Sequence, residues 1–149
     1  MPDFLELTID KFTFRVAIDR LYSPEGVWAK PEGGSVRIGM SDFLQQRSGD
    51  IAFAEIKPEG TALASGDEVA VIETIKVNIS LGSPVSGKVS EVNSEMEVAP
   101  EVINQDPYGK GWIATLETSD WEADQSQLLD APAYLARMKA EGEDEVNMK

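Results

Sequence analysis

Hydrophobic and polar residues alternate along the first part of the chain, and the phase of the alternation changes once. Residues 5–9 place leucine or isoleucine at odd positions, whereas residues 12–16 place phenylalanine or valine at even positions. Successive side chains of a strand point to opposite faces, so a one-residue change of phase moves the hydrophobic set to the other face. The pattern therefore predicts two strands joined by a turn or bulge at Asp10-Lys11.

Short strands are predicted at regular intervals through the rest of the chain. Turn signals separate them, such as Pro24-Glu25-Gly26 and Pro58-Glu59-Gly60, in which proline and glycine favour the backbone angles of turns. The predicted strands are 27–30, 35–40, 51–57, 66–74, 77–81, 87–93 and 112–117. Short strands at this spacing are typical of a β-sandwich or barrel.

Two helices are predicted among these strands. Residues 41–50 begin with Ser41, whose hydroxyl can cap the first turn, and they end near Gly49. Residues 130–140 begin with Asp130 as a second cap, and the proline that follows is tolerated in a first helical turn. The fold class is therefore mainly β, with a short internal helix and a C-terminal helix.

The length of the chain predicts one domain. A chain of 149 residues is long enough to bury a single sizeable core. We assign residues 22–140 to this domain and residues 1–21 to an N-terminal extension that contains strands. Residues 94–111 are expected to form an acidic loop, and the acidic tail 141–149 is expected to be disordered.

The composition excludes several classes of function. Thirteen basic and 27 acidic residues give a net charge of −14, so nucleic acid and anionic membranes are poor partners. The chain has no cysteine and no histidine, and so lacks a thiol nucleophile, an imidazole base and the usual zinc ligands. No apolar run approaches the ~20 residues that span a bilayer, and the N-terminus lacks a signal-peptide pattern, so we expect a cytoplasmic protein.

One lysine lies between two strand-like runs rich in valine and isoleucine. Lys76 follows the run 66–74 and precedes the alternating run 77–81. A turn over residues 74–78 would place Lys76 at the exposed tip of a hairpin. An amine in that position is accessible to a modifying enzyme. Accessibility alone does not predict a modification, because most lysines on protein surfaces carry none.

The segments on either side of this lysine resemble the lipoyl-attachment segment of the glycine cleavage H-protein family. The motif consists of "ETIK", which ends at Lys76, and "PVSG" at residues 84–87. Methionine usually flanks the lysine of biotin carriers, and Ile75 and Val77 take those places here. The resemblance extends over residues 22–138 and includes the blocks "VWAKPEGGSVRIGMSDFLQQRSGDIAFAEI", "SGKVSEVNSEM", "INQDPYGKGWIATL" and "LLDAPAYLARM".

The resemblance implies a carrier protein and not an enzyme, with a barrel-sandwich hybrid fold of the lipoyl and biotinyl type. Lipoic acid would be bound to Lys76 as an amide, and Glu73 would be recognised by the lipoate ligase or lipoyl transferase. The implied partners are glycine decarboxylase, aminomethyltransferase and dihydrolipoamide dehydrogenase, between which a monomeric carrier moves an aminomethyl group. No catalytic residue and no metal ligand are implied in the chain itself.

The chain departs from the family pattern at two places. Family members usually carry His-Glu-Trp in a region that holds the loaded arm, whereas this chain has Gly26, Val27 and Trp28. We expect Trp28 to pack in the core. The extension before Tyr22 is the second departure. These differences leave open an alternative, an H-protein-like lipoate-binding protein that carries sulfur intermediates in heterodisulfide-reductase-like sulfur oxidation.

Two further classes of function remain as alternatives of another kind. An enzyme would need a site, and carboxylates that could take part in acid–base or calcium chemistry occur at Asp50, Glu55, Asp67, Glu68 and Glu73. None of them lies in a recognisable metal loop, so we interpret most of them as solvated strand edges and turns. An unmodified interaction module is the other class, and for it the identity of residue 76 would not matter.

Overall fold

The computed structural model describes residues 3–147, and residues 144–147 are described by their backbone alone. Most of the strands in residues 3–147 are short. The strands are β1 (Phe4–Ile9), β2 (Phe12–Ala17), β3 (Leu21–Tyr22), β4 (Val27–Glu32), β5 (Ser35–Met40), β6 (Ile51–Ile56), β7 (Ala62–Leu63), β8 (Glu68–Thr74), β9 (Asn78–Gly82), β10 (Gly87–Val92) and β11 (Ala114–Thr118). The helices are α1 (Asp42–Ser48), α2 (Glu95–Val98), α3 (Val102–Gln105), α4 (Trp121–Gln125) and α5 (Ala131–Asn147).

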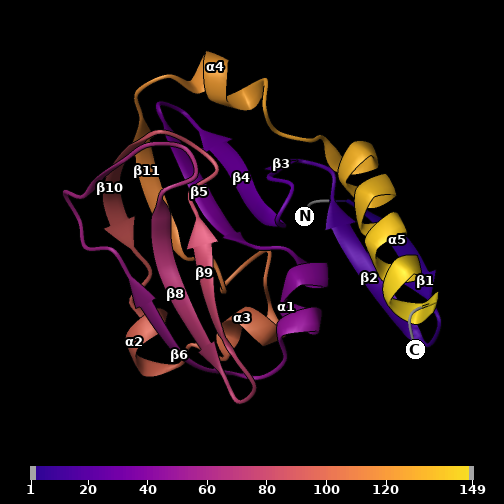
Figure 1. The fold of residues 1–149 in the computed structure, drawn as a ribbon. Helices are drawn as coiled ribbons and strands as arrows, with labels where there is room; N and C mark the ends of the chain where they lie inside the picture. The colour runs from indigo at the N-terminus through magenta and orange to yellow at the C-terminus, as the bar shows by residue number, and fades with distance from the viewer. Residues whose placement is uncertain (1–2, 148–149) are drawn as a thin grey trace.

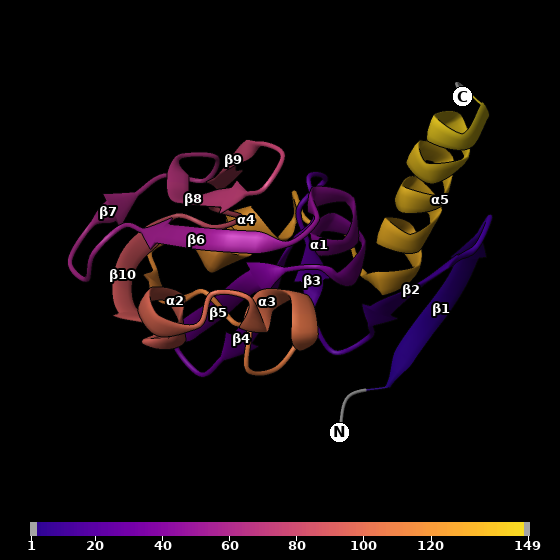
Figure 2. The same ribbon diagram turned by 90° about the horizontal axis from the view of Figure 1, so that it is seen from below.

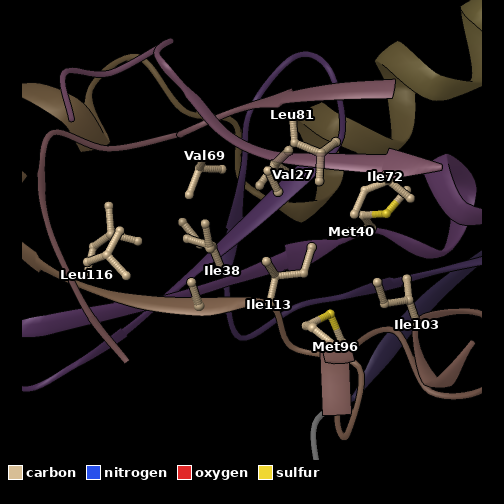
Figure 3. Close-up of a cluster of buried hydrophobic side chains, with 14 of the residues drawn as sticks. Val27, Ile38, Met40, Val69, Ile72, Leu81, Met96, Ile103, Ile113 and Leu116 are labelled. Atoms are coloured by element: carbon tan, nitrogen blue, oxygen red, sulfur yellow. The ribbon is translucent and has the colours of Figure 1, made fainter. Parts of the chain in front are cut away.

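Two sheets enclose the main hydrophobic core. A six-stranded sheet has the order β3-β4-β5-β11-β10-β7, and a three-stranded sheet has the order β6-β8-β9 (Figure 1). Figure 3 shows side chains of the six-stranded sheet, such as Val27 and Ile38, facing Ile72 and Leu81 of the three-stranded sheet. The sheets are open and form a sandwich, so the predicted mainly β class with an internal and a C-terminal helix is confirmed.

A second hydrophobic cluster joins the N-terminal hairpin to the C-terminal helix. The hairpin β1–β2 and α5 lie side by side at one end of the molecule (Figure 2). Phe14 from the hairpin, Phe43 from α1 and Met138 from α5 are buried together with Tyr22 and Trp28. The strands of the N-terminal extension are therefore packed against the rest of the fold.

Several local predictions are confirmed. The hairpin β1–β2 turns between Ile9 and Phe12, and Asp10 in that turn has a φ of 57°. The Ser41 hydroxyl accepts a hydrogen bond from the Leu44 N–H at the start of α1. At the start of α5, a carboxylate oxygen of Asp130 accepts a hydrogen bond from the Ala133 N–H.

Other predictions are wrong or incomplete. The segment 94–111, expected as a loop, contains α2 and α3, because Met96 and Ile103 enter the main core. The short strands β3 and β7 and the helix α4 were not predicted. No helix in residues 3–147 is both long and apolar enough to cross a membrane.

The acidic tail is helical where the structure describes it. Helix α5 continues to Asn147, so the expectation of disorder is wrong for residues 141–147, and residues 148–149 lie outside the described residues. Two contacts hold this part of the helix in place. Gly142 is buried against Ile9 of β1, and Glu141 pairs with Arg137 one turn earlier and with Arg47 of α1.

Candidate functional site

The β8–β9 hairpin places Lys76 in an exposed turn at one edge of the molecule. The two strands are antiparallel, and Glu73 and Asn78 form the last pair before the turn. Figure 1 shows this turn at the lower edge of the fold, beyond the ends of both strands. Lys76 is exposed, and the predicted turn over residues 74–78 is confirmed.

One side chain closes this turn. The Thr74 N–H donates to the Val77 carbonyl oxygen at 2.9 Å, and the Thr74 hydroxyl donates to the same oxygen at 2.9 Å. The hydroxyl oxygen also accepts hydrogen bonds from the N–H groups of Lys76, at 3.2 Å, and Val77, at 3.0 Å. Such local bonds from threonine side chains are typical of turns, and here they fix the backbone on both sides of the lysine.

The Lys76 ammonium lies over the C-terminal end of α1. A methyl carbon placed on Gly49 would lie 4.0 Å from Lys76 Nζ. Among the side chains of residues 3–143, no carboxylate pairs with Lys76, whereas Lys57 and Lys139 each pair with a glutamate. The amine is therefore open to reaction at its nitrogen without the loss of an ion pair to any of these residues.

The connection between α1 and β6 braces the base of the turn. The Ile75 N–H donates to the Asp50 carbonyl oxygen at 3.3 Å. The side chain of Asn104, at the end of α3, donates to the Gly49 carbonyl oxygen at 3.0 Å and accepts from the Ile51 N–H at 2.9 Å. These contacts tie the lysine-bearing turn to α1 and α3, which lie beside it.

Glu73 lies on the same hairpin as Lys76, three residues before it. It is half-buried on β8, between Phe53 of β6 and Asn78 of β9 in the sheet register. No ion pair of Glu73 occurs among the side chains of residues 3–143. The structure thus brings the two residues singled out in the sequence to the same end of one hairpin.

The positions that differ from the family pattern are filled by packing. Trp28 is buried, and its indole N–H donates to the Pro107 carbonyl oxygen at 2.9 Å, so core packing of Trp28 is confirmed. Val27 is buried in the main core. Gly26 has a φ of 101°, and a Cβ atom there would lie 2.7 Å from the Tyr134 hydroxyl. A histidine would not fit at residue 26 without displacing that helix contact.

Of the remaining candidate carboxylates, Asp50 and Glu55 are exposed, whereas Asp67 and Glu68 form structural contacts. Asp67 accepts a hydrogen bond from the Ala64 N–H in a turn, and Glu68 accepts one from the Ser80 hydroxyl on the neighbouring strand. No group of three or more acidic side chains able to hold a metal ion occurs in the part of the chain that the structure describes. The interpretation of these carboxylates as strand edges and turns agrees with this geometry.

A basic and aromatic pocket on the outer face of the six-stranded sheet was not predicted. It has a volume of about 350 Å³, and Arg20 and Arg37 line it together with Trp28, Tyr108 and Trp112. Arg20 is buried, lies 4.6 Å from the Trp28 ring centroid and donates to the Tyr108 carbonyl oxygen at 2.9 Å. Arg20 makes these contacts with other residues of the chain, so we interpret it as a structural residue that holds the loop carrying Tyr108 in place.

Sequence reasoning also missed Thr74 and Phe53 at the candidate site. A threonine two residues before the lysine is a signal for a side-chain-closed turn. Phe53 was assigned to a strand without regard to its direction, and a β-bulge between Ile51 and Phe53 turns its side chain outward. No sequence signal marks that bulge.

Comparisons with known proteins give one consistent result. The family described as "Glycine cleavage H-protein" matches residues 20–141. A glycine cleavage system H protein of Thermus thermophilus is 40% identical over 123 residues, which cover 83% of this chain and 95% of that protein. The corresponding protein of Carboxydothermus hydrogenoformans is 42% identical over 125 residues, which cover 84% and 95%.

A solved structure agrees with these relatives. A crystal structure of a glycine cleavage system H protein from Mycobacterium marinum superposes with a TM-score of 0.73 at 27% sequence identity. The superposition covers 82% of this chain and 98% of that one. The family match begins at residue 20, so the hairpin β1–β2 lies before the matched segment.

Proposed function

Because the chain belongs to the glycine cleavage H-protein family, we propose that it is a lipoyl carrier protein, modified on Lys76, that serves glycine cleavage. The observation that carries this proposal is the position of Lys76, an exposed amine at the tip of a hairpin whose turn is fixed by hydrogen bonds. No carboxylate among the described side chains, those of residues 3–143, pairs with this amine. The protein acts as a carrier and substrate of its partner enzymes, as a cytoplasmic monomer, and not as a catalyst.

The residues around Lys76 fit an amide-linked lipoyl group. Formation of the amide removes the ammonium charge, and this breaks no ion pair of Lys76 with any side chain of residues 3–143. The chain has no cysteine, so any sulfur chemistry requires a group from outside the polypeptide. Bound lipoate supplies a disulfide that can be reduced and can accept a transferred group.

Each residue at the tip has a distinct part in this proposal. Thr74 holds the turn so that the lysine has a fixed backbone, and the Ile75–Asp50 hydrogen bond ties the turn to the end of α1. Glu73 offers a carboxylate for recognition by the lipoate ligase or lipoyl transferase. The lipoyl group on Lys76 can then move while the backbone of the turn stays in place.

The proposed partners are glycine decarboxylase, aminomethyltransferase and dihydrolipoamide dehydrogenase. An aminomethyl group carried on one protein is presented to each enzyme at a high local concentration, since the arm is tethered. The net charge of −14 favours encounter with basic surfaces on these partners. Lysines and arginines around the active-site entrances of the partner enzymes would complement this negative charge.

One observation supports a second candidate function. The positions that carry His-Glu in the resembled family hold Gly26 and Val27, and both are enclosed by packing here. An aminomethyl cargo would lack the polar partners expected from that pair. We therefore keep the alternative of an H-protein-like lipoate-binding protein that carries sulfur intermediates in heterodisulfide-reductase-like sulfur oxidation.

A loading assay separates the two roles. The lipoylated protein is mixed with glycine decarboxylase and carboxyl-labelled glycine, and the release of labelled carbon dioxide is measured against the Lys76→Arg variant. Glycine cleavage predicts release that depends on the lipoylated wild-type chain. If the lipoylated protein supports no release but is used by sulfur-oxidation enzymes, the glycine role is wrong.

A further inference from the structure

Three large apolar side chains are exposed around the proposed modification site. Ile75 and Val77, the neighbours of Lys76 in the turn, are 74% and 54% exposed, and Phe53 on the adjoining strand is 67% exposed. Single exposed apolar residues are ordinary on protein surfaces, whereas a group at one place marks an interaction surface. Among the side chains that the structure describes, those of residues 3–143, the other large apolar ones with comparable exposure are Phe12, Ile18 and Val98.

Packing of the hydrophobic cores does not explain why these three exposed side chains are hydrophobic. The same strands contribute Ile51 and Ile72 to the main core, so their inward positions are already occupied. Phe53, Ile75 and Val77 belong to neither hydrophobic cluster nor to the residues packed against them. β-branched residues are also unusual in turns, where glycine, asparagine, aspartate and serine predominate.

Acidic side chains border the apolar ones. The register of β6 and β8 places Phe53 opposite Glu73, and Glu55 lies two residues further along the outward face of β6. Asp50 is exposed at the base of the turn. A complementary partner would therefore present an apolar recess with lysine or arginine at its edge.

We propose that Phe53, Ile75 and Val77 form the docking surface for the enzyme that attaches lipoate to Lys76. This inference rests on the proposed function. An acylating enzyme must take the Lys76 nitrogen into its own active site, and in doing so it covers the residues on either side of the lysine. Glycine-cleavage enzymes meet a longer group on this lysine and need not approach the turn as closely.

The step that this surface serves is an acyl transfer without oxidation or reduction. The donor is an activated lipoyl group, an acyl adenylate or a thioester. The Lys76 ammonium first loses a proton, and its nitrogen then attacks the carbonyl carbon. The amide C–N bond forms as the bond to the leaving adenylate or thiolate breaks, and the nitrogen releases its second proton. The docking residues take no part in these bonds, so they are positioning residues.

A matched pair of variants tests the proposal. Phe53→Ser removes an exposed aromatic ring at the docking surface, and Phe12→Ser removes one of similar exposure, 58%, in the N-terminal hairpin. Intact mass spectrometry follows lipoylation in time with lipoate, ATP and a bacterial lipoate ligase. Burial of a phenylalanine ring changes an equilibrium constant by about tenfold or more, so we expect kcat/KM to fall about tenfold in Phe53→Ser, mainly through KM. Phe12→Ser should match the wild type.

A chemical control shows whether the lysine itself has changed. Acetylation of Lys76 by a small activated ester, measured by peptide mass mapping, should proceed at the wild-type rate in Phe53→Ser. Ile75→Ser provides a second variant at the same surface. The inference is overturned if Phe53→Ser and Ile75→Ser are lipoylated like the wild type, or if chemical acetylation slows in parallel. Failure of the wild-type chain to accept lipoate would instead contradict the proposed function.

Discussion

At the scale of single residues, Thr74 has more influence on the lysine-bearing turn than any other side chain described there. Its hydroxyl takes part in three hydrogen bonds that join the two sides of the turn around Lys76. Neither of the flanking side chains, Ile75 and Val77, can replace these bonds. The conformation of the tip therefore depends on one hydroxyl group.

We expect Thr74→Val to loosen the turn and to lower stability. Loss of the hydroxyl leaves the N–H groups of Lys76 and Val77 to water, at a cost of about 0.5–1.5 kcal/mol in the free energy of unfolding because these bonds are exposed. Urea denaturation measures that free energy, and amide hydrogen exchange at residues 76 and 77 measures the local effect. Exchange at both amides should become faster.

Thr115→Val is the matched control for this substitution. The Thr115 hydroxyl oxygen is buried on β11, and it has no hydrogen-bond partner among the atoms that the structure describes. The same chemical change should therefore be neutral or stabilising there. Equal destabilisation by the two variants would show that the hydrogen bonds of Thr74 do not hold the turn.

Residue-level prediction from sequence succeeded where the signal is local. The caps Ser41 and Asp130 and the turn around Lys76 each depend on residues within a few positions of one another. For Phe53, reasoning from local sequence predicts the wrong face of the strand. Simple alternation places Phe53 on the same face as Ile51, whereas the bulge between them reverses its direction, and the bulge is set by pairing with β8.

At the scale of elements, three tyrosines join the N-terminal hairpin and α5 to the sandwich. Tyr22 of β3 stacks on Tyr134 of α5 with ring centroids 4.5 Å apart. The Tyr22 hydroxyl donates to the Ala17 carbonyl oxygen, the Tyr108 hydroxyl donates to the Arg15 carbonyl oxygen, and the Tyr134 hydroxyl bonds to that of Ser41. Each tyrosine therefore links two elements that are distant in the sequence.

This cluster predicts alkaline unfolding. Burial raises the pKa of Tyr108 to about 12, and burial also raises the pKa of Tyr22 and of Tyr134. The unfolded chain ionises its tyrosines near pH 10, so the folded state loses stability only as the pH rises from about 10 toward 12 and beyond. Phenolate absorbance, recorded together with circular dichroism, should rise above pH 10 and coincide with loss of the fold.

The same titration in denaturant is the control, because all three tyrosines of the chain should then ionise near pH 10. Full phenolate formation near pH 10 with an intact circular dichroism spectrum would contradict the buried tyrosine cluster. Tyrosine is a useful probe here because the chain has no cysteine or histidine that titrates in the neutral range.

Elements with regular patterns were predictable, and those that depend on tertiary contacts were not. Helices α2 and α3 have four residues each, too few for a helical period to stand out in an acidic segment. The extent of α5 was underestimated because its acidic end has the composition of a disordered tail. Packing of Gly142 on Ile9 and pairing of Glu141 with Arg47 supply what the local composition does not show.

At the scale of the whole molecule, the order of strands could not be derived from the residues alone. Strand β11 pairs with both β5 and β10, and the pairing of Val36 with Leu116 joins parts of the chain about eighty positions apart. Such pairing depends on the summed packing of the core. The fold class was still predictable, because the spacing of short strands and the resemblance of several blocks agree.

The candidate site and the hairpin that precedes the family match lie in different parts of the molecule. Figure 2 shows the N-terminal hairpin and α5 together on one side of the molecule, away from the β8–β9 turn. The hairpin precedes the segment that matches the family, and the lysine lies within that segment. The comparison of variants at Phe53 and Phe12 uses this separation, since Phe53 lies opposite Glu73 of the lysine-bearing hairpin and Phe12 lies at the turn of the N-terminal hairpin.

Intact mass spectrometry of the wild-type and Lys76→Arg chains, each made with and without lipoate, tests the central claim most directly. The account predicts one lipoyl group on the wild-type chain when lipoate is supplied and none on the arginine variant under any condition. A wild-type mass that never changes, or a lipoyl group that persists on Lys76→Arg, would contradict the assignment of Lys76 as the attachment site.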